Sequence, residues 1–333
     1  MNAPISFPHL CEARLLRLIS SHEVSGGLAD LIGEGIQITT LSERKGTYAV
    51  SGSQGDFIIR FARDEARLAT LRKEARIQKG LKDRVAVRIP DTQVIDGLEQ
   101  APAFAIHRLI PGEPLTSSYL SNLSPEAAQR LIQDLVLFFH ATHSIPQELA
   151  CEWLDIPFSR EKTITRLALT NGKPAWFSPQ AVAEMRPKLK PHLDDTLWGL
   201  FEGTVNLFEA LEISPDFMVF GHGDLHGYNM AMGVDPTGDR LTGVFDLECA
   251  GILDIHEDFF RLSLVSEGLL EQVLAAYQNL PGPTRPINRD RIAIYYQAFL
   301  FYLMVETPEK NLAHLKAMLQ KHLETYGPIS GAP

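Results

Sequence analysis

The sequence predicts an α+β fold in two lobes, with a small antiparallel-sheet lobe at the N-terminus and a larger, mainly helical lobe after it. Three observations support this prediction. Short strand patterns joined by turn residues fill most of the first hundred residues, a proline- and glycine-containing segment follows at 111–114, and helical periodicity dominates beyond it. We therefore divide the chain into residues 1–108 and 109–333. A length of 333 residues is enough for two such units.

The N-terminal lobe begins with a helical pattern at 15–24, which a glycine pair interrupts. Three strand patterns follow, and they cover residues 36–41, 47–50 and 57–61. The turn at 51–56 contains Gly55, which can adopt the positive φ that a tight hairpin needs. These patterns predict an antiparallel hairpin in the first lobe.

An amphipathic helix is expected at 65–81, because its apolar residues recur on one face and charged residues occupy the others. Two further strands are expected at 92–95 and 103–106, on either side of the turn Asp96–Gly97. The predicted order of the small lobe is therefore three strands, a helix and two strands.

The C-terminal lobe opens with a strong helix signal, in which Ser124 is the N-cap, Pro125 the first helical residue and His143 lies near the end. Residues 150–215 and the chain from 258 onward carry further helical patterns. The apolar stretch 292–305 is too short to cross a bilayer and predicts a buried helix. Helix packing is the expected role of the tryptophans, which are Trp153, Trp176 and Trp198.

The composition excludes several classes of protein. Charge counts of 31 Lys+Arg and 41 Asp+Glu give 31 − 41 = −10, and there is no basic stripe, so a nucleic-acid partner is not expected. Neither a signal peptide nor a membrane span is predicted. Cys11, Cys151 and Cys249 are odd in number and widely spaced, which argues against a disulfide framework and favours a cytoplasmic location.

The residues that indicate chemistry lie in two segments, 219–232 and 244–248, where short apolar runs end in polar clusters. Phosphoryl transfer needs a group that accepts the proton of the attacking hydroxyl, and hard oxygen ligands for a divalent metal ion. Asp224, Asn229 and Asp246 supply this set of side chains. A strand ending near residue 245 would deliver Asp246 to the site.

These motifs resemble those of the aminoglycoside phosphotransferase and choline kinase family, a branch of the protein-kinase-like fold. The sequence H-G-D-L-H-G-Y-N at 222–229 is similar to the family pattern H-G-D-x-x-x-x-N, and F-D-L-E at 245–248 is similar to its D-x-[DE] after a strand. The resemblance extends from about residue 36 to 305.

The resemblance implies roles for four of these residues. Asp224 would be the catalytic base, and Asn229 and Asp246 would hold Mg²⁺. Glu248 would lie nearby as a metal-associated acid. The phosphoryl donor would be ATP or GTP, and the acceptor would be a hydroxyl of a small molecule.

Two other features bear on the same resemblance. Residues 251–258 look like the family's G-D-P-x-x-D segment with the glycine and proline missing, and we interpret the retained Asp254 and Asp258 as structural. The long segment between His143 and His222 distinguishes this branch from protein kinases, as does the lack of an A-P-E signature. Helices inserted there help to form the acceptor pocket in this branch.

In the small lobe, the resemblance implies that Arg60 on the third strand pairs with Glu74 of the following helix and holds the nucleotide phosphates. Protein kinases have Lys at that position, and a guanidinium differs from an ammonium in its geometry. The loop 42–47 would cover the nucleotide, although it has one glycine only. Its contact residues would be Ser42, Gly46 and Thr47. Residues 104–109 would form the hinge and offer backbone groups to the purine, with Ile106 among the nucleotide-binding residues.

A zinc site built from His222, Asp224 and His226 is an alternative that we disfavour, because the spacing fits no known metal-binding helix. Gly223 and Gly227 favour a tight loop instead. His222 is expected to brace this loop, whereas His226 could either contact the substrate or cap the loop.

The sequence thus predicts an ATP- or GTP-dependent phosphotransferase acting on a small-molecule hydroxyl. Two alternatives stay open, an atypical protein kinase and a catalytically silent nucleotide-binding module. The acidic balance would suit polycationic aminoglycosides, but residues 150–215 mix acids and bases and do not define an anionic pocket.

Overall fold

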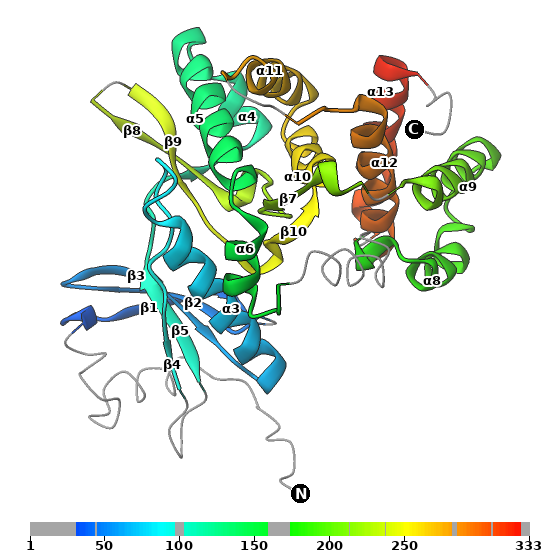
Figure 1. The fold of residues 1–333 in the computed structure, drawn as a ribbon. Coiled ribbons are helices and arrows are strands. Elements are labelled where there is room, and N and C mark those ends of the chain that lie inside the picture. The colour runs from blue at the N-terminus through cyan, green and yellow to red at the C-terminus, as the bar shows by residue number, and fades with distance from the viewer. Residues whose placement is uncertain are drawn as a thin grey trace, which may run out of the picture.

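The computed structural model has a mixed α+β architecture, with an antiparallel sheet at the N-terminus and a helical C-terminal region (Figure 1). It describes residues 31–43, 45–96, 103–158, 174–212, 214–236, 238–281, 285–307 and 309–327. The helical pattern predicted at 15–24 lies outside these residues, as do Cys11 and Gly97.

The N-terminal sheet has five antiparallel strands in the order β1-β2-β3-β5-β4. They are β1 (Gln37–Ser42), β2 (Thr47–Gly52), β3 (Gly55–Phe61), β4 (Gln93–Ile95) and β5 (Phe104–Arg108). The predicted hairpin is formed by β2 and β3, with Gly55 at a φ of 118°. The sheet places β3, the strand of Arg60, at its centre.

Helix α3 (Glu65–Leu81) has the bounds that its periodicity predicts, and Asp64 caps its N-terminus through a hydrogen bond from the backbone N–H of Arg67. Successive residues of β5 point to opposite faces of the sheet. Ala105 packs with Leu68 and Leu71 of the helix, whereas Phe104 lies in the cluster on the other face. The helix therefore lies on one face of the sheet, beside β3.

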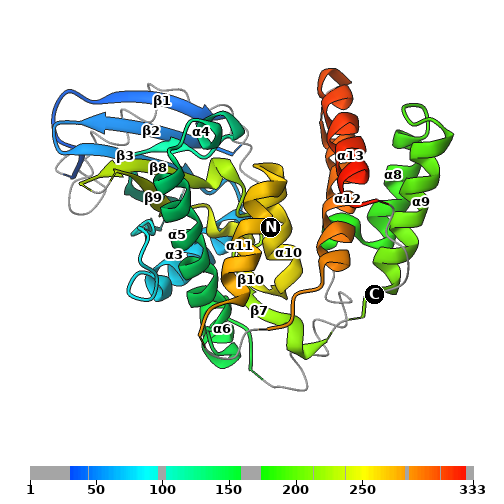
Figure 2. The ribbon, with the colours of Figure 1, turned by 90° about the horizontal axis from the view of Figure 1, so that it is seen from above.

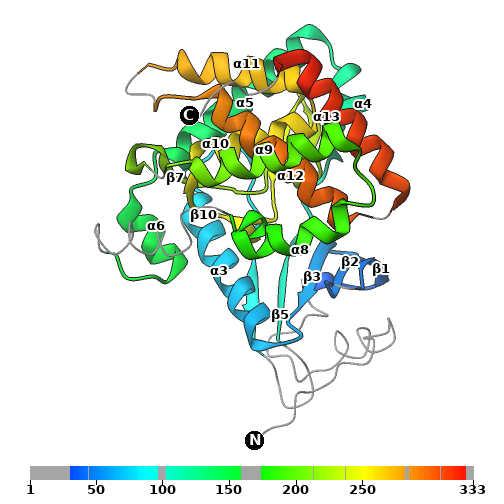
Figure 3. The same ribbon diagram turned by 90° about the vertical axis from the view of Figure 1, so that its right-hand side faces the viewer.

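The C-terminal region contains most of the helices and two small sheets. The helices are α4 (Ser117–Ser121), α5 (Pro125–His143), α6 (Gln147–Leu154), α8 (Pro179–Leu189), α9 (Asp195–Ala210), α10 (Ile255–Phe260), α11 (Glu267–Gln278), α12 (Arg289–Glu306) and α13 (Leu312–Tyr326). Helices α5, α10 and α11 lie between the N-terminal sheet and a further group of α8, α9, α12 and α13 (Figure 2). Figure 3 shows that further group from its outer side.

The two small sheets carry the candidate site between them. One pairs β7 (Met218–Gly221) with β10 (Gly251–Asp254), and the other has the order β6 (Glu113–Pro114), β8 (Met230–Asp235), β9 (Gly238–Val244). The strand predicted before Asp246 is β9. Strands β6 and β10 were not predicted, because each is short and is stabilised by a partner distant in sequence.

Aromatic residues fill the core of the helical region. Helix α12 is buried on most of its circumference, which confirms the prediction made from its apolar sequence. Trp176 contacts five aromatic rings, and Trp153 packs edge-to-face on Phe220, so both tryptophans take part in helix packing. Within the described ranges no helix combines the length and apolar character that a membrane span requires.

Candidate active site

The H-G-D segment follows β7, a strand whose four residues are all buried. The chain then turns through the 3₁₀ segment Gly227–Asn229 into β8. Gly223 has a φ of 74°, and a Cβ atom on Gly227 would lie 2.0 Å from the carbonyl oxygen of Leu115. Both positions of the loop therefore require glycine, as the sequence predicts.

Asp258 of α10 fixes the backbone of this loop. Its carboxylate accepts hydrogen bonds from the backbone N–H groups of His222 (3.2 Å) and Gly223 (2.8 Å), and from Nε2 of His143 (3.1 Å). Burial alone would raise the pKa of Asp258, but the hydrogen bond and charge of His143 hold it below its ordinary value. The structural interpretation of Asp258 is confirmed.

Asp254 is likewise structural, because its carboxylate is buried and bonded within the helical region. It accepts hydrogen bonds from Arg291, from the Tyr295 hydroxyl at 3.2 Å and from both the backbone N–H and Nδ1 of His256. These bonds attach the start of α10 to α12.

His222 braces the loop, as predicted. Its Nε2 donates to the carbonyl oxygen of Phe245 at 3.0 Å, and its Nδ1 accepts from the backbone N–H of Asp224 at 3.2 Å. This pattern defines the neutral tautomer with the proton on Nε2. Both ring nitrogens are used, and no group of three or more His, Cys, Asp or Glu that could hold a metal occurs in the described ranges, so the zinc alternative has no support.

The side chain of Asp224 lies among three partners. The Nδ2 of Asn229 donates to the carbonyl oxygen of Asp224 at 2.8 Å and lies 3.5 Å from Oδ2. The Nη1 of Arg261 is 3.3 Å from Oδ1, and Nε2 of His226 is 3.7 Å from Oδ2. His226 also caps the following turn, since its Nδ1 accepts from the backbone N–H of Tyr228 at 3.2 Å.

Asp246 follows β9 with a left-handed backbone, at φ 60° and ψ 59°. This conformation is uncommon outside glycine and costs on the order of 1 kcal/mol. Its Oδ1 is buried and accepts no hydrogen bond, while Nζ of Lys45 lies 3.8 Å from Oδ2 and Nη1 of Arg60 lies 4.0 Å from Oδ1. The Asp246 carboxylate thus combines an oxygen that has no hydrogen-bond partner with two nearby cationic side chains. This combination makes it a candidate contact for a charged ligand.

Helix α3 holds the turn Leu247–Cys249 after Asp246. Glu74 pairs with Arg60 at 2.6 Å and also accepts a hydrogen bond from the backbone N–H of Leu247 at 3.1 Å. On the same helix, Arg67 lies 2.7 Å from Glu248, and Lys73, the residue before Glu74, donates to the carbonyl oxygen of Glu248 at 2.6 Å. The helix thus connects the sheet of the first lobe to the candidate metal-binding turn.

The environment of Glu74 is unusual for a carboxylate. Burial raises its pKa, and the charge and hydrogen bond of Arg60 act in the opposite direction. With 1% of its surface exposed, Glu74 has Arg60 as the cation that offsets its charge.

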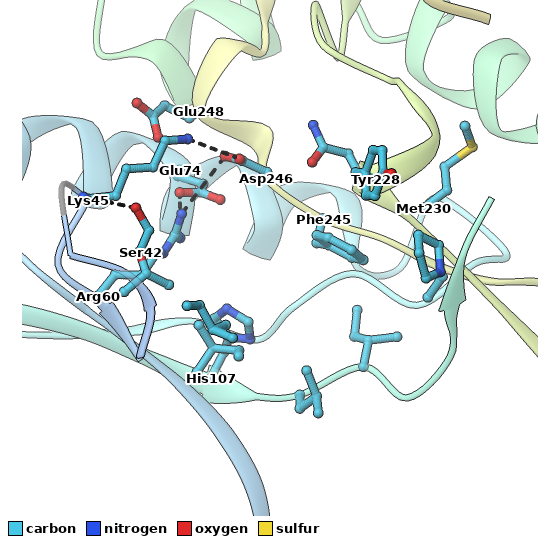
Figure 4. A pocket seen from close by; sticks show the side chains of 18 of the residues that line it. Ser42, Lys45, Arg60, Glu74, His107, Tyr228, Met230, Phe245, Asp246 and Glu248 are labelled. Carbon is cyan, nitrogen blue, oxygen red and sulfur yellow. Dashed lines mark hydrogen bonds and ion pairs between the residues drawn. The ribbon is translucent and has the colours of Figure 1, made fainter. Parts of the chain in front are cut away.

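A pocket of ≈ 530 Å³ lies between the sheet and the H-G-D loop (Figure 4). Arg60, Glu74 and Asp246 gather on one side of it, and Tyr228 and Phe245 on the other. The predicted site residues that line it are Ser42, Thr47, Arg60, Glu74, Asn229, Asp246 and Glu248.

Two predicted contacts do not line this pocket. Gly46 forms the positive-φ turn of the loop 42–47 but does not face the cavity. Ile106 is 3% exposed and packs in the core of the sheet, on β5 between β3 and β4, so its side chain does not line the pocket, and a contact through its backbone stays a prediction. The period of the strand turns Ile106 inward, and His107 and Leu109 line the pocket instead. Burial lowers the pKa of His107 to about 4, so this ring is neutral near pH 7.

A second pocket, of ≈ 480 Å³, lies on the other side of the H-G-D loop. Asp224 and His226 line it, together with Thr116 and Ser117 and an apolar wall from α12 and the segment before α11. Tyr228 lines both pockets and is 69% exposed. Asp224 therefore faces one pocket, and Asn229, which is bonded to it, faces the other.

Sequence reasoning missed four charged or titratable residues of this region. They are Lys45, Arg67, His107 and Arg261, and the partners of Lys45, Arg67 and Arg261 are distant in the chain. Lys45 and His107 carried a signal, because they lie in the loop and the hinge that the resemblance assigns to the nucleotide.

The chain has a kinase-like fold, and comparison with known proteins gives the family. The chain belongs to the phosphotransferase enzyme family (APH), whose model matches residues 39–294. A search of curated proteins by sequence finds no significant match.

Solved structures similar to this chain include both aminoglycoside and macrolide phosphotransferases. The GDP complex of a variant of aminoglycoside 2'-phosphotransferase-IIIa aligns with a TM-score of 0.62 at 20% identity, over 90% of this chain and 93% of that one. Macrolide 2'-phosphotransferase type I gives a TM-score of 0.60 at 17% identity, over 94% and 99%. The streptomycin–ATP complex of APH(2")-IIa gives 0.55 at 15% identity, over 97% and 99%. At these identities the likeness shows a shared fold.

Proposed function

We propose that this protein transfers the γ-phosphoryl group of ATP or GTP to a hydroxyl group of a small molecule. The observation that carries the proposal is the position of the H-G-D loop between two pockets. Asp224 faces one pocket, and Asn229, Asp246 and Arg60 line the other. A phosphotransferase needs this arrangement, because donor and acceptor must meet at one proton-accepting group.

The ≈ 530 Å³ pocket is the proposed nucleotide site, shared by the lobe 1–108 and the catalytic loop of the lobe 109–333. Arg60 and Lys45 would offset the charge of the phosphates, with Glu74 orienting the guanidinium at 2.6 Å. The apolar side chains near β5 and the neutral ring of His107 would surround the base. The Ser42–Thr47 turn would lie over the phosphates.

The residues present fit Mg²⁺. Asp246 offers a buried oxygen that accepts no hydrogen bond, and Asn229, which lines the same pocket, offers an amide oxygen. Mg²⁺ is commonly held by one or two protein oxygens together with substrate phosphates and water, which agrees with the absence of a larger acidic cluster from the described residues. When bound, the ion would neutralise phosphate oxygens. Glu248 lines the same pocket, lies 2.7 Å from Arg67 and would be a metal-associated acid near the ion.

In the proposed reaction, Asp224 accepts the proton of the acceptor hydroxyl as the oxygen forms its bond to the γ-phosphorus. The bond between that phosphorus and the bridging oxygen breaks, and the nucleoside diphosphate leaves with its electron pair. Arg261 and Asn229 hold the carboxylate of Asp224 in place at 3.3 Å and 3.5 Å.

The relatives support the proposal in outline. The similar structures include complexes with GDP, ADP or ATP, and complexes with streptomycin, gentamicin or kanamycin. They therefore support a purine nucleotide as donor without choosing between ATP and GTP. We also propose a cytoplasmic location, because the cysteine pattern argues against a disulfide framework.

The test is Asp224→Asn in the purified chain, assayed for transfer of labelled phosphate from ATP and GTP with Mg²⁺ to a panel of alcohols. Loss of general-base catalysis should lower kcat by about 10²- to 10⁴-fold while thermal unfolding stays cooperative. Asp83→Asn, at an exposed position away from both pockets, is the matched control.

The alternatives give different results in the same assay. Label that appears on protein and not on any alcohol would indicate a protein kinase. Nucleotide binding without transfer by the wild type would indicate a silent module. Wild-type turnover by Asp224→Asn would refute the role of Asp224.

A further inference from the structure

The pocket that Asp224 faces is largely apolar. Five apolar side chains line it, namely Leu115, Leu264, Val265, Phe299 and Leu303. Its neutral hydroxyl groups are those of Thr116, Ser117 and Tyr228, and Ser117 already donates a hydrogen bond to the carbonyl oxygen of Val265 at 2.9 Å. Such a wall offers contact area for a hydrophobic ligand and few sites for a strongly hydrated one.

The charge of the pocket is close to zero. Asp224 is the one carboxylate among its described lining residues, and Arg261 lies 3.3 Å from it. Arg261 is 4% exposed, and its guanidinium lies over the rings of Phe260 and Phe299, at 4.7 Å and 3.9 Å from their centroids. The fixed cation therefore offsets the charge of the catalytic carboxylate from within the wall.

His226 also lines the pocket, and it adds no negative charge that would attract a cation. Its Nδ1 accepts a hydrogen bond from the backbone N–H of Tyr228 at 3.2 Å, and its Nε2 lies 3.7 Å from Oδ2 of Asp224. An imidazole can be neutral or cationic but not anionic near pH 7, so Asp224 is the one anionic group among the described lining residues.

We infer that the acceptor is an uncharged alcohol with an apolar body, and that polycationic aminoglycosides are poor acceptors. This inference rests on the proposed phosphotransferase function and specifies its substrate class. A ligand with several ammonium groups would lose hydration on entering this pocket and would meet one carboxylate that Arg261 already offsets. An apolar ring gains contact with the wall without that loss.

The test uses alcohols that share one scaffold and differ in charge. The probes are 4-tert-butylcyclohexanol, which is neutral, 4-aminocyclohexanol, which carries an ammonium group, and kanamycin, which carries several. Binding to the whole chain is measured by protein-observed NMR or calorimetry, and transfer is measured separately with labelled ATP and GTP. We expect the neutral probe to bind more tightly than the ammonium probe by a factor on the order of ten or more.

A charge placed in the wall should reverse this preference. Leu303 on α12 is half-buried, so Leu303→Glu can be accommodated, and it should weaken binding of 4-tert-butylcyclohexanol and strengthen binding of 4-aminocyclohexanol. The matched control is Leu137→Glu, because Leu137 is 50% exposed on α5 and lies outside the pocket. The control should behave as the wild type with both probes.

The outcomes separate the two proposals. Tighter binding or faster phosphorylation of kanamycin or 4-aminocyclohexanol by the wild type would overturn the inference and leave the phosphotransferase function intact. No binding of the neutral alcohol up to its solubility limit would also overturn it. Preferred binding of the neutral alcohol, lost in Leu303→Glu but with no transfer to any probe, would support the ligand class and contradict the proposed function.

Discussion

Glu257 lies on α10 next to Asp258, the residue that fixes the H-G-D loop, and takes no direct part in the proposed chemistry. Its carboxyl group is buried on α10, where it faces Arg261, Asp254 and Asp258 and bonds to the side chain of Trp176. Burial raises the pKa of Glu257 to about 8, against the opposing charge of Arg261. The group is therefore protonated in the folded protein near pH 7, whereas a glutamate in the unfolded chain is ionised.

This difference predicts how stability depends on pH. Below the ordinary value of 4.5 both states are protonated, and between 4.5 and about 8 the folded state holds one proton more than the unfolded state. The contribution of Glu257 to the free energy of unfolding should therefore fall by about 1.4 kcal/mol per pH unit as pH rises through this window. Glu257→Gln removes this contribution, so the variant should gain stability relative to the wild type as pH rises. Urea unfolding of both proteins across the window measures the difference.

Other groups titrate in the same range, and a control separates them. Glu184→Gln removes a carboxyl group at an exposed position on α8. Its stability should run parallel to that of the wild type at every pH. A parallel course for Glu257→Gln as well would show that Glu257 is ionised in the folded protein.

Among elements, α3 connects the two lobes. Its N-terminal half contacts the turn after Asp246, and near its C-terminus Gly80 lies against Trp153 of α6. A Cβ atom on Gly80 would lie 2.3 Å from Cε2 of the Trp153 ring. The absence of a side chain at Gly80 therefore permits the close approach of these two helices.

This contact predicts an unusual result for a helix glycine. Gly80→Ala should destabilise the protein by about 1–3 kcal/mol, because the indole ring has to move. Gly199 on α9 has no atom within 4 Å of an added Cβ, so Gly199→Ala should be neutral or stabilise by up to about 1 kcal/mol. Chemical denaturation of the two variants measures the contrast. Equal effects would mean that α3 and α6 do not pack as closely as the structure shows.

The helices, strands and loops also differ in how far the sequence could predict them. The hairpin of β2 and β3, helix α3 and the H-G-D loop depend on local patterns, namely turn glycines, amphipathic spacing and a motif with fixed offsets. Strand β10 and the contacts of Lys45, Arg67 and Arg261 depend on segments far apart in the chain. No local pattern records such partners, and the residues were missed for that reason.

The segment 104–109 shows a different limit. Whether a side chain of this segment faces the core or the pocket depends on the register of β5 between β3 and β4, which the resemblance does not give. A shift of one residue separates the buried Ile106 from His107, which lines the pocket.

At the scale of the whole molecule, the proposed nucleotide site is built from both lobes. The sheet contributes Arg60 and the turn after β1, and the helical region contributes Asn229 and Asp246. A ligand in this pocket therefore binds the folded protein and not the unfolded chain. Its binding should raise the free energy of unfolding by about 2.7 kcal/mol at a hundredfold excess over Kd.

The metal-dependent part of that stabilisation should come from Asp246. ATP or GTP with Mg²⁺ should raise the melting temperature of the wild type above the value with nucleotide alone, since the ion would be held between phosphate oxygens and this carboxylate. Asp246→Asn lowers the charge of the site, so it should keep a response to nucleotide but lose most of the extra response to Mg²⁺. Asp83→Asn should respond as the wild type does. Calorimetric melting with each nucleotide measures the Mg²⁺ effect. If this effect is undiminished in Asp246→Asn, the ion binds to other ligands, and the buried oxygen of Asp246 cannot be assigned to it.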